Sequence, residues 1–204
     1  MDWKNILLYA RGGTRETAKG TMTELASDPL DGSLLVQQGG KLRAAALAGR
    51  LFTACNTAIV TTTVGATTTW AGLGVANPAG SGIKIIMHEF NFAQWLINTG
   101  EGILALATTT DSGFAAAITP RNRAFGGPPS KAYVDDGATV VAPVVEQYIA
   151  SLTHGAADVD GVPAILRVDL HGSLVLLPGR SVVTYTDIAQ LKCSYGFMWE
   201  EIPL

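Results

Sequence analysis

The sequence predicts an all-β protein: an antiparallel β-sandwich, jelly-roll-like, with an extended N-terminal arm. From residue 51 onward, short runs of alternating apolar and polar residues are separated by clusters of Gly, Pro, Asn and Asp. Residues 51–83 include no Asp, Glu, Lys or Arg and are rich in Thr, Ala and Gly, a mixture typical of close-packed strands. A two-layer sandwich buries such strands, and the jelly roll is a common way to arrange about nine or ten of them.

The first 50 residues differ from the remainder in composition, because they hold 12 of the 31 charged residues. Asp28-Pro29-Leu30-Asp31-Gly32 is a strong turn signal. We therefore expect residues 1–32 to form an N-terminal arm and residues 33–204 to form the β-sandwich domain. The residues leave open whether the arm packs on a neighbouring subunit or is a flexible terminus.

The strands of the first half are expected between turn signals. Residues 41–49 fit either a helical turn or a strand because of their alanine content. The cluster from Asn77 to Gly82 must be a turn. The expected strands are residues 33–37, 57–64, 67–75, 83–97, 103–110 and 114–119.

Residues 83–97 give the clearest alternation. Ile86, His88, Phe90, Phe92 and Gln94 share one face of a regular strand, and we expect this aromatic face to point into the core. Residues 120–137 are expected to form one long loop. Loops of that length in a compact domain are usually functional or lie at a contact.

The C-terminal third is expected to contribute strands over residues 144–152, 164–170, 172–177, 181–186 and 192–202. Tyr195, Phe197 and Trp199 alternate in the last strand, so they should lie on one inward face. Glu200 and Glu201 are expected to mark the exit of the strand to solvent.

The high apolar and low charged content of the chain indicates that it assembles with copies of itself or with another surface. Hydrophobic residues make up 48% of the chain and charged residues 15%, against about 25% charged in typical domains. A monomer this apolar would expose large apolar patches, which usually mark interfaces, so we expect an obligate oligomer or a protein that coats another surface.

Charge and motif content argue against several other classes. The net charge of −3 and the lack of any basic run argue against nucleic-acid binding. Threonine clusters interrupt every candidate membrane span, and the N-terminus carries no export signal, so folding in a cytoplasm is expected. Cys55 and Cys193 are expected to be two free, buried thiols.

Three groups of residues suggest chemistry, and in each case a structural explanation is simpler. Asp169, His171 and Ser173 resemble a nucleophile–base–acid set, but triad members converge from different elements, so a polar strand face is favoured. His88 beside Glu89 is expected to be a satisfied strand histidine. The third group, His154, Asp158 and Asp160, lacks the later bidentate acid of a calcium loop and is more simply a turn. No cofactor and no metal are expected.

Two segments resemble β-rich virion structural proteins of tailed bacteriophages. One runs from Leu73 through Asn77-Pro78-Ala79-Gly80-Ser81-Gly82 into the strand at residues 83–92. The other comprises residues 174–179, 181–185 and 196–203. Together they cover about 50 residues of the 204 and carry no catalytic residues. The resemblance implies a head decoration (cement) protein, or a tail- or fibre-associated structural protein, that is usually trimeric.

The expected function is therefore that of a non-enzymatic virion protein, a capsid decoration protein assembled in the host cytoplasm. Its expected partners are copies of itself, as a homotrimer, and the major capsid protein or other virion proteins. Apolar arm residues are expected to make the contacts to the capsid or a neighbouring subunit: Trp3, Ile6, Leu7, Leu8 and Tyr9. The alternatives are a tail-associated receptor- or carbohydrate-binding module using Phe125 and Tyr133, and a hydrolase using His154 or His171.

Overall fold

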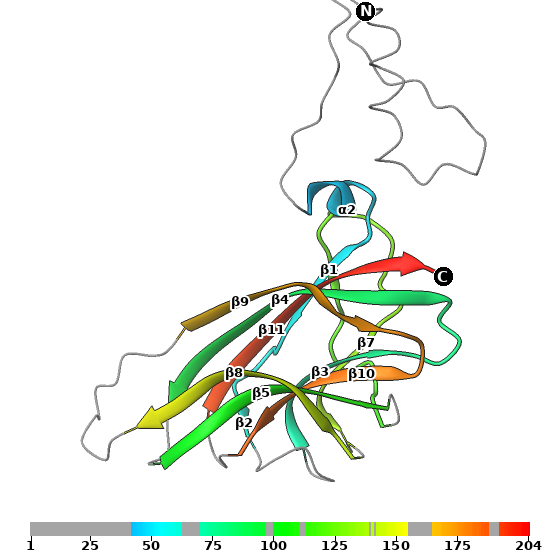
Figure 1. The fold of residues 1–204 in the computed structure, drawn as a ribbon. Helices are drawn as coiled ribbons and strands as arrows, with labels where there is room; N and C mark the ends of the chain where they lie inside the picture. Colours follow the sequence, from blue (N-terminus) through cyan, green and yellow to red (C-terminus); the bar gives the residue numbers. More distant parts are fainter. Residues whose placement is uncertain are drawn as a thin grey trace, which may run out of the picture. The chain divides into compact units, whose positions relative to one another are not determined.

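Two antiparallel sheets pack face to face (Figure 1). A computed structural model describes residues 42–62, 70–96, 100–110, 113–138, 140, 142–154, 165–187 and 192–204. The first sheet has the strand order β6-β1-β11-β4-β9, with β2 also paired to β11, and the second has the order β7-β3-β10-β5-β8. The expected all-β sandwich is confirmed, whereas the predicted arm, residues 1–32, and the predicted strand 33–37 lie outside the described residues.

The described residues contain eleven strands and one short helix, α2 (Arg43–Leu47). The sequence of residues 41–49 fitted either a helical turn or a strand, and the structure shows that this segment contains the helix. The strands are β1 (Leu51–Cys55), β2 (Val60–Thr61), β3 (Trp70–Asn77), β4 (Ile83–Leu96), β5 (Gly100–Thr110), β6 (Arg121–Asn122), β7 (Tyr133–Ala138), β8 (Val144–His154), β9 (Ile165–Leu176), β10 (Arg180–Thr186) and β11 (Lys192–Pro203).

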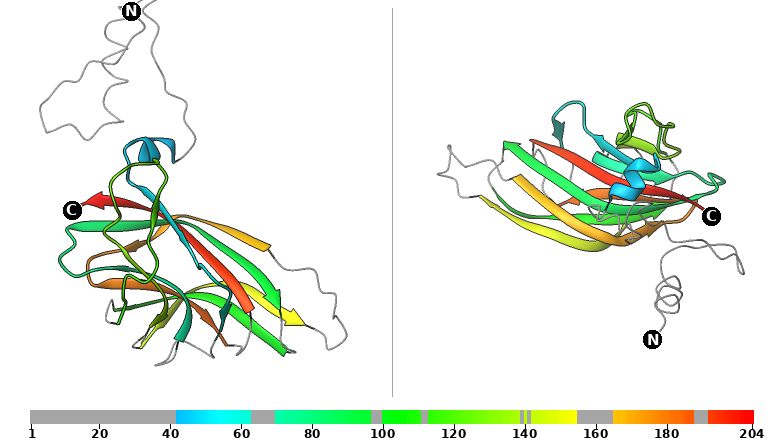
Figure 2. Two further views of the ribbon diagram at one scale, coloured as in Figure 1. Left: turned by 180° about the vertical axis from the view of Figure 1, so that it is seen from behind. Right: turned by 90° about the horizontal axis from the view of Figure 1, so that it is seen from above.

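The strand pairing is that of a jelly roll. Eight strands form nested antiparallel pairs, with β1 beside β11, β3 beside β10, β4 beside β9, and β5 beside β8. The first half of the domain is thus paired with the second half in reverse order, like a long hairpin wound into two layers. Figure 2 shows the two layers from behind and from above.

Aromatic side chains of β4 and β11 fill the space between the sheets. Tyr195, Phe197 and Trp199 are all buried, which confirms that they share the inward face. The Phe90 ring lies 5.1 Å from the Phe197 ring and 6.2 Å from the Tyr195 ring, between centroids. Leucines and valines of the second sheet complete this core.

A β-bulge changes the inward face of β4. Phe90 and Phe92 point inward as predicted, but before them Ile85 and Met87 are the residues with no exposed surface. The pairing to β11 skips His88, so this residue is the extra one in the strand and the alternation shifts by one position. The prediction that Ile86 and His88 share the core face with the phenylalanines is therefore wrong.

A second apolar cluster covers the outer face of the second sheet. Leu73 and Val75 of β3 belong to the inner core, so Gly72 and Gly74 face outward. The ring of Phe114 lies directly over Gly74, and the ring of Trp70 lies close to Gly72. Strand β3 is consequently buried on both faces, which explains why its residues carry no charge.

The chain between β5 and β8 makes a long excursion that reaches both sheets. Its residues 121–122 pair with β1 as strand β6, and its residues 133–138 pair with β3 as strand β7. The prediction of one loop over residues 120–137 is therefore only partly correct. The predicted strand at residues 114–119 is wrong: Phe114 leaves the sheet to pack on its outer face, and only Ile118 forms a bridge, to Val134.

Three further expectations need correction. The predicted strands 164–170 and 172–177 are one strand, β9, with a bulge at His171 and Gly172, which both have positive φ. The strand predicted at 57–64 is reduced to β2 within the described residues. Glu201 does not mark an exit to solvent, because it is buried, with 7% of its surface exposed.

Candidate interaction surface

The residues that the sequence singled out do not converge on one site. The predicted arm contacts from Trp3 to Tyr9 lie outside the described residues, as do Asp158 and Asp160. Within the part of the chain that the structure describes, no three His, Cys, Asp or Glu side chains gather as metal ligands would. In the same part, no helix is both long and apolar enough to cross a membrane.

Asp169 and His171 stabilise a backbone turn. The His171 N–H donates to Asp169 Oδ1 at 2.8 Å, and His171 Nδ1 lies 3.2 Å from the same oxygen. Both side chains are more than half exposed at the β9 bulge. The bulge also breaks the regular strand face on which Asp169, His171 and Ser173 were expected to align, so these residues form a solvated turn.

His88 has a partner that sequence spacing did not reveal. As the bulge residue of β4 it places Nε2 3.5 Å from a carboxylate oxygen of Glu200 on β11. The other oxygen of Glu200 pairs with Arg50 at 3.0 Å. Neither ring nitrogen of His88 makes a hydrogen bond among the described residues, so the contact with Glu200 meets the expectation of a satisfied strand histidine only in part.

The two cysteines lie on opposite faces of the first sheet. Both are free, as predicted. Cys193 is buried in the core, where burial raises the pKa of its thiol to about 12. Cys55 is exposed on the outer face, so the expectation that both thiols are buried holds only for Cys193.

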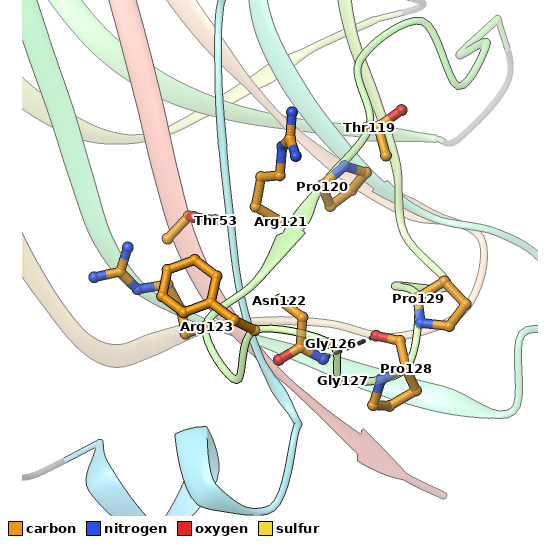
Figure 3. Close-up of a pocket in the computed structure, with 11 residues that line it drawn as sticks. Thr53, Thr119, Pro120, Arg121, Asn122, Arg123, Gly126, Gly127, Pro128 and Pro129 are labelled. Atoms are coloured by element: carbon orange, nitrogen blue, oxygen red, sulfur yellow. Dashed lines mark hydrogen bonds between the residues drawn. The ribbon is translucent and has the colours of Figure 1, made fainter.

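Among the described residues, a pair of hollows lies on the outer face of the first sheet. The first, of about 650 Å³, lies between β1 and the tip of the excursion (Figure 3). The second, of about 600 Å³, lies between β1, β4 and helix α2. Thr53 and Arg123 line both, so the two hollows adjoin each other. We call these two hollows together the arginine surface.

Asn122 fixes the excursion above this surface. Its side-chain amide donates to the carbonyls of Gly49 and Pro128, both at 2.8 Å, and its side-chain oxygen accepts from the Ala124 N–H (Figure 3). The Gly127 N–H then bonds to the Ala124 carbonyl, which closes a tight turn with Gly126 at φ +83°. A positive φ at this position is what makes glycine suitable here.

That turn presents Phe125 to solvent. The side chain is 97% exposed, more than any other large apolar residue that the structure describes. Full exposure of a phenyl ring forgoes about 1.5–3 kcal/mol of burial energy, and a hydrogen-bonded turn holds it in place. A preorganised, exposed aromatic group is well suited to enter a pocket on another molecule.

Glu201 holds the returning limb of the excursion. Its carboxylate accepts from the Ser130 hydroxyl, from the Lys131 N–H at 3.1 Å and from the Trp199 indole N–H at 3.2 Å. Nothing in the sequence distinguishes this buried glutamate from a surface one, because two of these three donors, Ser130 and Lys131, lie about 70 residues away in the chain. Its role therefore depends on the tertiary fold.

This surface combines cationic and apolar groups. It offers guanidinium groups, a phenyl ring and the thioether of Met198. No protein-family model matches the chain, and no curated protein and no solved structure shows significant similarity to it.

Proposed function

We propose that this chain is a non-enzymatic structural protein of a virion, a decoration protein that binds a capsid surface as a homotrimer and stabilises it. The observation that carries the proposal is the rigidly held excursion with Phe125 at its tip. A structural protein of this kind acts by adhesion, and it needs apolar groups that are ordered before binding.

The fold is compatible with this proposal but does not select it. Jelly rolls occur in viral capsid proteins, and also in lectin domains and cupins. Function therefore has to be argued from the surface. Residues 73–92 and the closing strands resemble phage virion proteins. This resemblance supports a virion protein over a lectin domain or a cupin.

The arm residues Trp3, Ile6, Leu7, Leu8 and Tyr9 are proposed as a second contact. Two weak contacts on one chain reinforce each other, because the second forms at high effective concentration once the first has formed. Repetition of such contacts over a shell stabilises it without any single strong interaction.

The test is sedimentation of the full chain with empty shells assembled from the coat protein of the same virus. We expect saturable binding and a higher unfolding temperature of the shells. Deletion of residues 1–12 should abolish shell binding and leave the folded oligomer intact. If the full chain stays in the supernatant at micromolar concentrations, or if the deletion variant binds equally well, the assignment is wrong.

A second candidate function is a receptor- or carbohydrate-binding module of the tail. Two exposed aromatic residues of the excursion, Phe125 and Tyr133, favour it. The Tyr133 side chain is 44% exposed. Sugars stack on such rings, and a hollow of about 650 Å³ adjoins Phe125. A glycan array that yields no binder would remove this candidate.

A further inference from the structure

We propose that the arginine surface binds an extended, acidic protein segment that also carries an apolar side chain. This inference rests on the proposed function, because it names the chemistry of the partner that this surface contacts. It follows from three observations: the local charge, the lack of described carboxylate partners for three arginines, and the fixed backbone positions of these arginines.

The local charge is opposite to that of the chain. The two hollows are lined by four arginines and one glutamate, a sum of +3: Arg43, Arg121, Arg123, Arg167 and Glu89. The chain as a whole carries −3, so its remaining residues sum to −6. A positive surface favours a partner that carries negative charge.

Three of these arginines have no carboxylate partner among the described residues. Arg167 pairs with Glu89, whose carboxylate also accepts from the Asn91 amide at 2.8 Å. No described carboxylate forms an ion pair with Arg43, Arg121 or Arg123, and all three residues are exposed. Their guanidinium groups are therefore available for carboxylates of another chain, which they bind in bidentate geometry.

The backbone fixes the spacing of these arginines. Arg121 stands opposite Thr53 in the β6–β1 ladder, and the Arg123 N–H bonds to the Leu51 carbonyl at 2.8 Å. Arg43 is the first residue of helix α2. Because the charges are spread over two adjoining hollows, they match carboxylates distributed along a peptide better than one compact anion.

The composition of the surface favours protein over nucleic acid. Neither hollow is lined by lysine, and the four arginines that line them are spread over two hollows. Phosphate recognition along a strand also needs a continuous basic groove, usually with several stacked aromatics. The apolar groups here include Met198 in one hollow and Phe125 in the other, which suit an aliphatic or aromatic side chain next to the carboxylates.

The experiment is a selection with the full chain from a displayed library of random twelve-residue peptides. We expect enriched peptides to be acidic and to contain a large apolar residue. One of them is then synthesised and titrated by fluorescence polarisation, alongside a version in which Asp and Glu are replaced by Asn and Gln. The neutral version should bind at least about tenfold more weakly, and added salt should weaken the acidic one.

Variants of the chain locate the binding surface. The double variant Arg121→Gln, Arg123→Gln should bind the acidic peptide at least about tenfold more weakly. The matched control removes two exposed charges elsewhere, with Arg180→Gln and Lys192→Gln, and should change binding less than about twofold. Phe125→Ala should weaken binding without changing the salt dependence.

Several results would overturn the inference: no enriched peptide, enriched peptides that are not acidic, or undiminished binding by the arginine double variant. Stronger binding of a single-stranded DNA 20-mer through the same arginines would replace the acidic peptide by nucleic acid as the ligand. Shell sedimentation separates this inference from the proposed function. If the arginine double variant still binds shells, only the inference fails; if the wild-type chain binds peptide but no shell, only the proposed function fails.

Discussion

Asn77 joins the two sheets at the end of the sandwich where two turns meet. It is fully buried, and its side-chain amide donates to the carbonyls of Ile83 at 2.8 Å and Leu176 at 2.9 Å. Its side-chain oxygen accepts from the Ser81 hydroxyl at 2.6 Å. One residue of the second sheet thus satisfies backbone groups at the ends of β4 and β9 in the first sheet.

Replacing Asn77 with Ala should destabilise the fold by about 2–4 kcal/mol, because it leaves buried carbonyls without a donor. Urea unfolding followed by tryptophan fluorescence measures this loss. Tyr195→Phe is the matched control, since the buried Tyr195 hydroxyl interacts with the Cys193 thiol, a weak hydrogen-bonding group, and its removal should cost less than about 1 kcal/mol. Equal losses in both variants would contradict the role assigned to Asn77.

Cys193 makes stability depend on alkaline pH. Burial raises the pKa of its thiol from 9.0 to about 12 in the folded chain. Because the folded pKa lies above the unfolded one, the stabilisation is complete below pH 9 and is lost as the pH rises towards 12, by about 1.4 kcal/mol per pH unit. Urea unfolding of the wild type and of Cys193→Ala should show a stability difference that shrinks over this range. Parallel curves would mean that Cys193 ionises equally easily in both states.

At the scale of elements, alternation predicted those strands whose pattern is uninterrupted. β11 and β10 are close to their predicted bounds because one face of each is continuously buried. Alternation does not predict a strand correctly where the strand contains a bulge. The bulge at His88 shifts the inward face of β4, and the bulge at His171 and Gly172 gives β9 the pattern of two strands. A bulge is set by the neighbouring strand, so the strand's own sequence does not identify it.

The candidate surface was foreseen only in part. A contact role for the excursion followed from its length and its two exposed aromatics, and this role remains a prediction. The arrangement of Arg43, Arg121 and Arg123 did not follow, because the first lies 78 positions from the second in sequence. Only the pairing of β6 with β1 brings these positions to one face of the sheet.

Packing of Phe114 on β3 gives a prediction about glycine. A Cβ atom at Gly74 would lie 2.3 Å from the Phe114 ring, so Gly74→Ala must displace that ring and open the start of the excursion. We expect a loss of about 1–3 kcal/mol and faster amide exchange over residues 113–118. Gly137→Ala on the neighbouring strand is the control, because its Cβ would meet only one atom, at 3.9 Å. A neutral Gly74→Ala variant would show that Phe114 does not cover the strand.

At the scale of the whole molecule, burial within one chain accounts for much of the uncharged middle. Leu104, Ala105, Leu106 and Ala107 of β5 expose no surface, so both faces of that strand are covered. Neutrality there does not by itself require a second subunit. Exposed apolar side chains are the feature that favours oligomerisation instead. The structure describes ten exposed large hydrophobic residues. Half of them lie on β8, on β9 or just after β9: Val144, Tyr148, Ile165, Val175 and Leu177.

Light scattering behind a sizing column tests whether these side chains form a subunit contact. We expect a mass of about 64 kDa, three times 21.3 kDa. Burial of each such residue contributes about 1.5–3 kcal/mol, which is enough for several together to offset an association cost of about 4–15 kcal/mol. Tyr148→Lys with Ile165→Lys should therefore yield monomers, whereas Ala116→Lys, at an exposed position of the excursion, should not. A wild-type monomer at micromolar concentration would contradict the trimer. Under the proposed function, the exposed residues of β8 and β9 would then contact another protein of the shell, and the chain would oligomerise only where that protein aligns its copies.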